Sequence, residues 1–267
     1  MTSRVPLERW IRRPAGSPRP GQARLVCFPY AGGGGGVFHP WGSVCPPALD
    51  LCAVVLPGRE ARLAEEPVEE LLPLVRTLAT VLAPVLLPPF ALYGHSLGAV
   101  LAYELARELG RSGRPLPSAL FVSGRNAPHL ADPRPRLHRL PRKEFVEEIV
   151  RRYNGIPEAI LAEPELLDLL LPALRADVAM IERYVHEPGE SLGVPIHVFG
   201  GLSDPSTTRV GLEAWRELAG GRFTLRLLPG DHFFLQTARA ELLSAIGETL
   251  ALAIAPALAL VPGPPRG

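Results

Sequence analysis

The chain has 267 residues with 28 basic and 27 acidic side chains, so its formal net charge at pH 7 is +1. This balance lacks the basic excess typical of proteins that bind nucleic acid, and we expect no nucleic-acid partner. The first twenty residues contain no apolar signal-peptide core, and no long uncharged apolar run follows. We therefore expect a cytoplasmic protein that does not enter a membrane.

Apolar runs alternate with helical periods along the chain. Strands are predicted at 24–29, 51–55, 90–93, 118–123, 195–200 and 222–228, and helices at 68–83, 97–110, 209–219 and 238–254. Such alternation predicts an α/β fold with a mostly parallel central sheet and helices on both faces. Both ends are rich in Pro and Gly, so we expect a mobile segment at 1–22, a single domain at 23–255 and a mobile tail at 256–267.

The three cysteines, Cys27, Cys45 and Cys52, are odd in number, lie in or near apolar segments and lack CxxC spacing. This pattern predicts buried free thiols rather than a disulfide or a metal site. The sequence has no motif for a cofactor either, so we expect neither a metal nor a cofactor.

The pentapeptide GHSLG at residues 94–98 has the GxSxG spacing of a nucleophile elbow. A predicted strand leads into it and a helix-forming run leaves it, which is the context that the motif requires. The turn brings strand and helix close together, leaving no room for a Cβ at either glycine. We predict that Ser96 is a catalytic nucleophile, and that His95 packs or forms a hydrogen bond rather than acting as a second base.

About seventy residues separate the predicted strands 118–123 and 195–200, far more than a crossover needs. Helical segments are predicted at 142–153, 164–171 and 173–185, with prolines such as Pro172 between them. We predict a helical lid insertion over about 126–193, because a segment between nucleophile and acid lies over the active-site edge. Its leucines either pack on the sheet or shape an acyl pocket, and for the pocket we select Leu166, Leu170 and Leu174.

A serine hydroxyl needs a general base, and the base needs an orienting acid. Asp204 and His232 each follow a predicted strand, so both are expected at the same sheet edge as Ser96. The chain order Ser, Asp, His matches that of an α/β-hydrolase triad. Asp231 is the main rival acid, although adjacent side chains near a strand end diverge. Asp177, in a helical stretch, is the weaker rival.

Acyl transfer through a tetrahedral intermediate needs two N–H donors at the developing oxyanion. One is predicted at Leu97, which follows the nucleophile at the start of a helix. A run of five glycines at 32–36 follows the first predicted strand, where a flexible linker would be out of place. By position we predict Ala31 as the second donor, with Tyr30 as the alternative.

Six runs of the sequence together resemble the type II thioesterases, stand-alone α/β-hydrolases that accompany polyketide synthases and nonribosomal peptide synthetases. They are residues 27–33 (CFPYAGG), 56–60 (LPGRE), 94–98 (GHSLG), 121–125 (FVSGR), 174–177 (LRAD) and 230–235 (GDHFFL). The resemblance extends from about Trp10 to Ile254. It implies an α/β-hydrolase fold with a helical lid insertion.

The resemblance also implies an activity and a partner. The substrate is an acyl thioester on the phosphopantetheine arm of an acyl- or peptidyl-carrier protein, and hydrolysis clears stalled or misprimed chains. The matching motifs carry the nucleophile, acid, base and two oxyanion donors at Ser96, Asp204, His232, Ala31 and Leu97. We expect the protein to be a monomer.

Two residues depart from the family pattern. Leu97 stands where the family often has Met, which leaves the backbone amide in place. Asp231 stands where Gly is common, and its negative charge favours a more basic His232. Two other functions stay open: a small-molecule carboxylesterase with the same triad, and a catalytically silent carrier-binding module.

Overall fold

The computed structural model describes residues 6–258 of the chain. Its sheet has the strand order β1-β3-β2-β4-β5-β6-β7, in which every neighbouring pair is parallel except β1 and β3. The predicted α/β fold with a mostly parallel sheet is confirmed. The strands are β1 (Ile11–Arg12), β2 (Ala23–Phe28), β3 (Leu49–Val54), β4 (Phe90–His95), β5 (Leu120–Ser123), β6 (Ile196–Gly201) and β7 (Phe223–Leu228).

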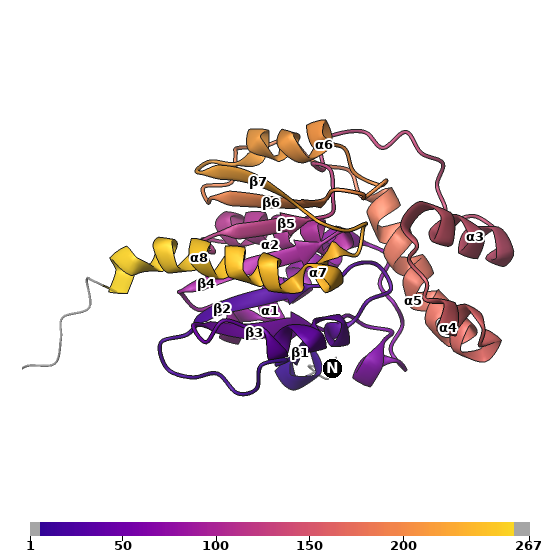
Figure 1. Ribbon diagram of the computed structural model, residues 1–267, viewed down its shortest axis with the longest axis horizontal. Coiled ribbons are helices and arrows are strands. Elements are labelled where there is room, and N and C mark those ends of the chain that lie inside the picture. The colour runs from indigo at the N-terminus through magenta and orange to yellow at the C-terminus, as the bar shows by residue number, and fades with distance from the viewer. Residues whose placement is uncertain (1–5, 259–267) are drawn as a thin grey trace, which may run out of the picture.

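Helices cover both faces of this sheet, as Figure 1 shows. Side chains of α1, α2 and α6 form one core cluster with the sheet, and side chains of α7 and α8 form a second on the other face. Apart from Arg24 on β2, every residue of β2, β3, β4 and β5 is buried, because both faces of the sheet are covered. The helices are α1 (Leu71–Val81), α2 (Leu97–Arg111), α3 (Arg142–Tyr153), α4 (Glu158–Leu161), α5 (Pro164–Arg183), α6 (Arg209–Glu213), α7 (Phe234–Thr237) and α8 (Arg239–Leu258).

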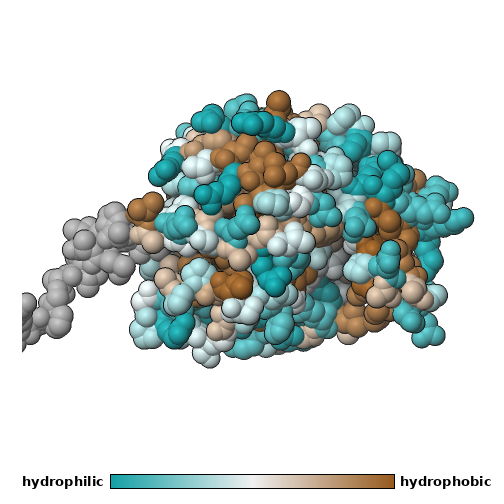
Figure 2. All heavy atoms as spheres, viewed as in Figure 1, coloured by the Kyte–Doolittle hydropathy of each residue, from teal (hydrophilic) through white to brown (hydrophobic). Residues whose placement is uncertain are grey.

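Between β5 and β6 the chain leaves the sheet and forms α3, α4 and α5, which lie together at one end of the molecule (Figure 1). This insertion (residues 126–193) has its own apolar core, to which Phe145, Ile149, Leu171 and Val178 contribute. Its outer surface is partly apolar: Figure 2 shows hydrophobic side chains where these helices lie, and Leu169 is half exposed.

The predicted helix break at Pro172 is wrong, because α5 continues from Pro164 to Arg183. Proline cannot donate a hydrogen bond to the carbonyl four residues earlier. Here both Asp168 and Pro172 are exposed, so water can solvate that carbonyl. Burial of Leu171 and Leu174 on the opposite side offsets the lost bond.

Residues 7–12 pack against the sheet, which differs from the expectation of a mobile segment at 1–22, whereas residues 15–21 are exposed. Strand β1 pairs with β3, and Trp10 is buried under the guanidinium of Arg62, 3.5 Å from the ring centre. A buried aromatic ring and a paired strand edge supply the contacts that a Pro- and Gly-rich composition does not reveal. Residues 259–267 of the predicted tail lie outside the described residues, and α8 extends to Leu258.

Cys27 and Cys52 are buried free thiols and Cys45 is half buried. Burial raises the pKa of Cys52 to about 12 and that of Cys45 to about 11. Within residues 6–258, none of the helices combines the length and apolar character needed to cross a membrane.

Candidate active site

Ser96 lies in a strained turn between β4 and α2, with φ +55° and ψ −111°. A Cβ on Gly94 would stand 1.9 Å from the carbonyl oxygen of Gly98, and a Cβ on Gly98 would stand 2.2 Å from that of Phe28. Both clashes are with backbone, which cannot move aside. The glycines are therefore required for the close approach of strand and helix, and the strain at Ser96 is typical of a functional turn.

Asp204 and His232, from the loops after β6 and β7, form a buried pair. Nδ1 of His232 lies 2.9 Å from Oδ2 of Asp204, and each residue is less than a tenth exposed. Burial by itself raises the pKa of the Asp204 carboxyl, but the hydrogen bond and charge of His232, together with hydrogen bonds from Ser206, hold this pKa below its ordinary value. An ionised Asp204 holds the histidine proton on Nδ1, which leaves Nε2 as the basic nitrogen.

Ser206 also bonds to this pair, and no sequence motif indicated it. Its hydroxyl donates to Oδ1 of Asp204 at 2.6 Å and lies 2.9 Å from Nδ1 of His232. Its backbone N–H also donates to Oδ1 of Asp204, at 2.8 Å. These bonds further lower the Asp204 pKa. A serine two residues after a candidate acid is the local signal that could have indicated this turn.

The two rival carboxylates have other partners. Oδ1 of Asp231 accepts a hydrogen bond from the backbone N–H of Phe233 at 2.8 Å, next to the start of α7. Asp177 is fully buried on α5. Its two carboxylate oxygens accept hydrogen bonds from the two Nη atoms of Arg59, at 2.6 and 2.8 Å. The structure therefore brings only Asp204, of these three carboxylates, into hydrogen bonding with His232.

The predicted oxyanion donors lie in two backbone segments that border one cavity. Leu97 is the first residue of α2, where N–H groups have no acceptor inside the helix. Ala31 lies in a tight turn in which Gly33 N–H donates to the Tyr30 carbonyl at 2.9 Å. Neither the Ala31 nor the Leu97 amide donates to an acceptor within residues 6–258. Both amides are therefore available to a substrate.

His95 is a buried core residue rather than a base. Its Nδ1 lies 2.8 Å from the hydroxyl of Ser123, and its ring centre is 5.0 Å from that of His232. Burial, followed by the charge of His232, lowers the pKa of His95 well below its ordinary value. A neutral imidazole beside His232 fits the predicted packing role.

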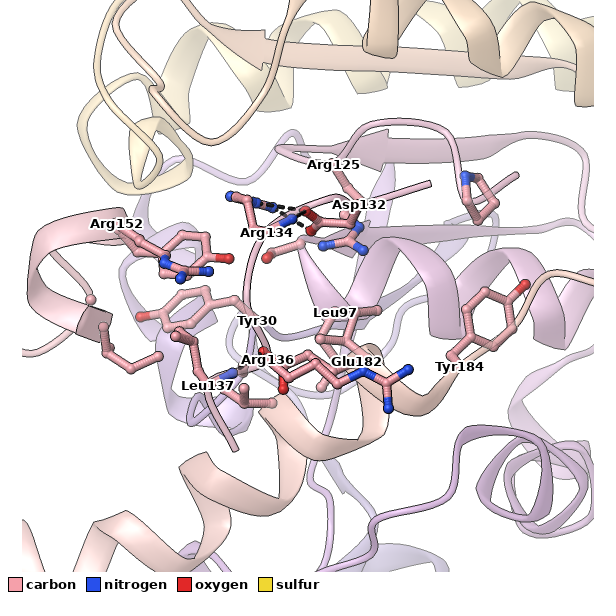
Figure 3. A pocket seen from close by; sticks show the side chains of 18 of the residues that line it. Tyr30, Leu97, Arg125, Asp132, Arg134, Arg136, Leu137, Arg152, Glu182 and Tyr184 are labelled. Atoms are coloured by element: carbon pink, nitrogen blue, oxygen red, sulfur yellow. Dashed lines mark hydrogen bonds and ion pairs between the residues drawn. The ribbon is translucent and has the colours of Figure 1, made fainter. Parts of the chain in front are cut away.

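A cavity of about 480 Å³ reaches Ser96 and His232. Its wall combines the elbow with the insertion, as Figure 3 shows for Leu97, Arg125, Arg134 and Tyr184. Arg134 pairs with Asp132, whereas the guanidinium of Arg125 donates no hydrogen bond within the described part of the chain. Burial lowers the pKa of Arg125. Arg125 ends the run 121–125 noted in the sequence, whereas no sequence pattern indicated Arg134 and Tyr184, which lie in irregular segments of the insertion.

Of the three leucines of α5 that were predicted to line the acyl pocket, only one borders the cavity. Leu174 lines the cavity, but Leu166 and Leu170 are not among its lining residues. Leu166 is 40% exposed, and the buried face of α5 carries Leu167 and Leu171 instead. Successive helix positions turn by about 100°, so a leucine next to a buried one points elsewhere. The prediction that Leu166 and Leu170 line the pocket is therefore wrong.

A family model described as a thioesterase domain matches residues 23–250. The chain belongs to the thioesterase family. This thioesterase is 40% identical over 233 residues to the gramicidin S biosynthesis protein GrsT of Aneurinibacillus migulanus, with 87% of this chain and 91% of the relative covered. It is 38% identical over 243 residues to the thioesterase PikA5 of Streptomyces venezuelae, with 90% and 85% covered.

The thioesterase is also similar to the solved structure of the type II thioesterase BorB from the borrelidin biosynthetic cluster. The TM-score is 0.82 at 39% identity, and the match covers 90% of this chain and 97% of BorB. The predicted membership of the type II thioesterases is confirmed, and with it the α/β-hydrolase fold and a hydrolase acting on thioesters.

Proposed function

We propose that this thioesterase hydrolyses acyl groups held as thioesters on the phosphopantetheine arm of acyl- or peptidyl-carrier proteins. Its role is to clear stalled or misprimed chains from a polyketide or nonribosomal peptide synthase. The supporting observation is the elbow serine facing the same cavity as the buried Asp204–His232 pair, in a chain whose relatives serve such biosynthetic systems. No such pair is needed in a module that only binds carriers.

The reaction proceeds in two halves. Nε2 of His232 takes the hydroxyl proton as Oγ of Ser96 bonds to the thioester carbonyl carbon. The amides of Ala31 and Leu97 stabilise the oxyanion, the carbon–sulfur bond breaks, and His232 returns the proton to the leaving thiolate. Water, deprotonated by His232, then attacks the acyl carbon; as the bond to Oγ of Ser96 breaks, His232 gives this proton to Oγ, and the carboxylic acid and free Ser96 are released.

We propose that the insertion is the lid of this cavity. Leu174 and Val178 of α5 supply apolar wall near the nucleophile, while Arg125, Arg134 and Tyr184 make other parts of the wall polar. An acyl chain fits the apolar part. The amide groups of a phosphopantetheine arm are suited to the polar part, where guanidinium groups donate to carbonyl oxygens.

The direct test compares wild type and Ser96→Ala on acetyl-carrier protein and on a p-nitrophenyl ester. We expect wild type to prefer the carrier substrate, and Ser96→Ala to lose about 10⁴-fold or more in kcat while keeping its circular dichroism and Tm. A preference for the free ester would favour a carboxylesterase. A folded wild type that binds the carrier protein without hydrolysing it would indicate a silent binding module.

A further inference from the structure

The turn from Tyr30 to Gly33 determines where the Ala31 amide points. Gly33 N–H donates to the Tyr30 carbonyl at 2.9 Å, which closes the turn, and Gly32 has φ +79° at its third position. The Tyr30 carbonyl and the Ala31 N–H belong to one trans peptide plane and point in opposite directions. Because the carbonyl is held inside the turn, the Ala31 N–H is directed out of it.

A buried ion pair forms hydrogen bonds with the Ala31–Gly32 peptide of this turn and with the Gly33–Gly34 peptide that follows it. Oδ2 of Asp177 accepts the Gly32 N–H at 2.7 Å, and Nη1 of Arg59 donates to the Gly33 carbonyl at 2.8 Å. The same two atoms, Oδ2 and Nη1, meet each other at 2.6 Å, and Nη2 donates to Oδ1 at 2.8 Å. Arg59 comes from the loop after β3 and Asp177 from α5, so three distant segments meet at the turn.

Helix α5 also touches the turn directly. A Cβ on Gly32 would stand 3.0 Å from Cδ1 of Leu174, one helical turn before Asp177. The helix therefore contacts Gly32 through both an apolar side chain and a carboxylate. A displacement of α5 would pull on the Gly32 amide, and with it on the neighbouring Ala31.

Stability alone does not account for this pair. Taking an arginine and an aspartate out of water costs several kcal/mol per ion, and apolar residues of similar volume often serve a fold as well or better. What a bidentate guanidinium–carboxylate pair provides is fixed geometry. Asp177 and Arg59 are at most 5% exposed at their side chains, which protects that geometry from competition by water.

We propose that Arg59 and Asp177 are positioning residues that hold the Ala31 amide in the oxyanion hole and couple this hole to the lid helix α5. The inference rests on the proposed oxyanion role of Ala31. It means that movement of α5 for substrate entry also loosens the oxyanion hole, so catalysis is completed only when the helix is seated.

The test uses the double variant Arg59→Met, Asp177→Leu, which leaves no unpaired buried charge, beside the single variant Asp177→Asn. The matched control is Arg142→Gln, Asp168→Asn, which removes an exposed Arg–Asp pair between α3 and α5. Two rates are measured on protein whose Tm is recorded: hydrolysis of acetyl-carrier protein, and labelling of Ser96 by a p-nitrophenyl phosphonate, whose phosphoryl oxygen occupies the oxyanion hole.

We expect the double variant to keep a Tm near that of wild type while kcat falls by about 10- to 100-fold, with KM changed by less than about threefold. Labelling should slow by a similar factor, and the control should match wild type in both rates. Wild-type labelling in a folded double variant would overturn the proposal. Should wild type fail to hydrolyse carrier thioesters, the proposed function fails, yet the labelling rates still test the positioning pair.

Should the double variant not fold, Asp177→Asn decides. This variant leaves Arg59 without a charged partner and replaces one acceptor oxygen by an NH2 donor, so the bidentate pair with the guanidinium is lost. Labelling slowed by at least fivefold in its folded fraction supports the proposal. A normal labelling rate in that fraction overturns it.

Discussion

Replacement of Leu174 by Ala should shift the acyl-chain preference of the enzyme toward longer chains. Leu174 lines the cavity and is only 9% exposed. The change opens space for about three methylene groups, and each buried methylene contributes about 0.8 kcal/mol. Full use of this space would provide about 2 kcal/mol, or about thirty-fold. Partial collapse of the site lowers the expected shift to about tenfold.

The assay is kcat/KM for acetyl- and octanoyl-carrier protein, expressed as the octanoyl-to-acetyl ratio. The ratio cancels any effect that the loss of contact with Gly32 has on the oxyanion hole, since both substrates use it. Leu170→Ala is the matched control, because Leu170 lies on α5 outside the cavity lining. We expect its ratio to stay within about twofold of wild type, and Leu174→Phe to lower the ratio. Equal ratios in all three variants would refute the assignment of Leu174 to the acyl pocket.

Three further predictions follow from the site and its surroundings. Asp204→Asn should lower kcat by about 10³- to 10⁴-fold and Asp231→Asn by less than about tenfold in steady-state assays. The reverse ranking would mean that Asp231, not Asp204, orients His232. Ser206→Ala should lower kcat/KM by about three- to tenfold and more strongly at acid pH, because the Asp204 pKa rises when the hydroxyl is lost; a pH–rate profile parallel to wild type would contradict this. Burial lowers the pKa of His197 from 6.5 to about 4, so the unfolded state alone takes up its proton between these pH values. The free energy of unfolding should be highest above pH 6.5 and should fall by about 2 kcal/mol toward pH 4. In urea titrations, His197→Gln should reduce this dependence on pH. Part of the dependence should remain, because the pKa of His95 is also lowered.

The residues of the proposed triad could be selected from the sequence because each is marked by its immediate neighbours in the chain. Ser96 stands between two glycines that only a tight strand-to-helix turn requires, and Asp204 and His232 each lie in the loop that follows a strand, β6 or β7. In a parallel sheet the carboxyl ends of strands share one edge, so local signals alone indicate a common location. The strand positions followed for the same reason, since a buried strand is a short continuous apolar run.

Tertiary structure decided the contacts that join distant segments. Arg59 and Asp177 are 118 positions apart, and nothing near either residue reveals that their side chains meet beneath Gly32. The placement of α5 is another case: Leu170 and Leu174 lie one helical turn apart on α5, and only the packing of α5 against the rest of the protein determines which of them borders the cavity. Periodicity specifies which residues share a helix face, but the direction of that face depends on the partner that buries it.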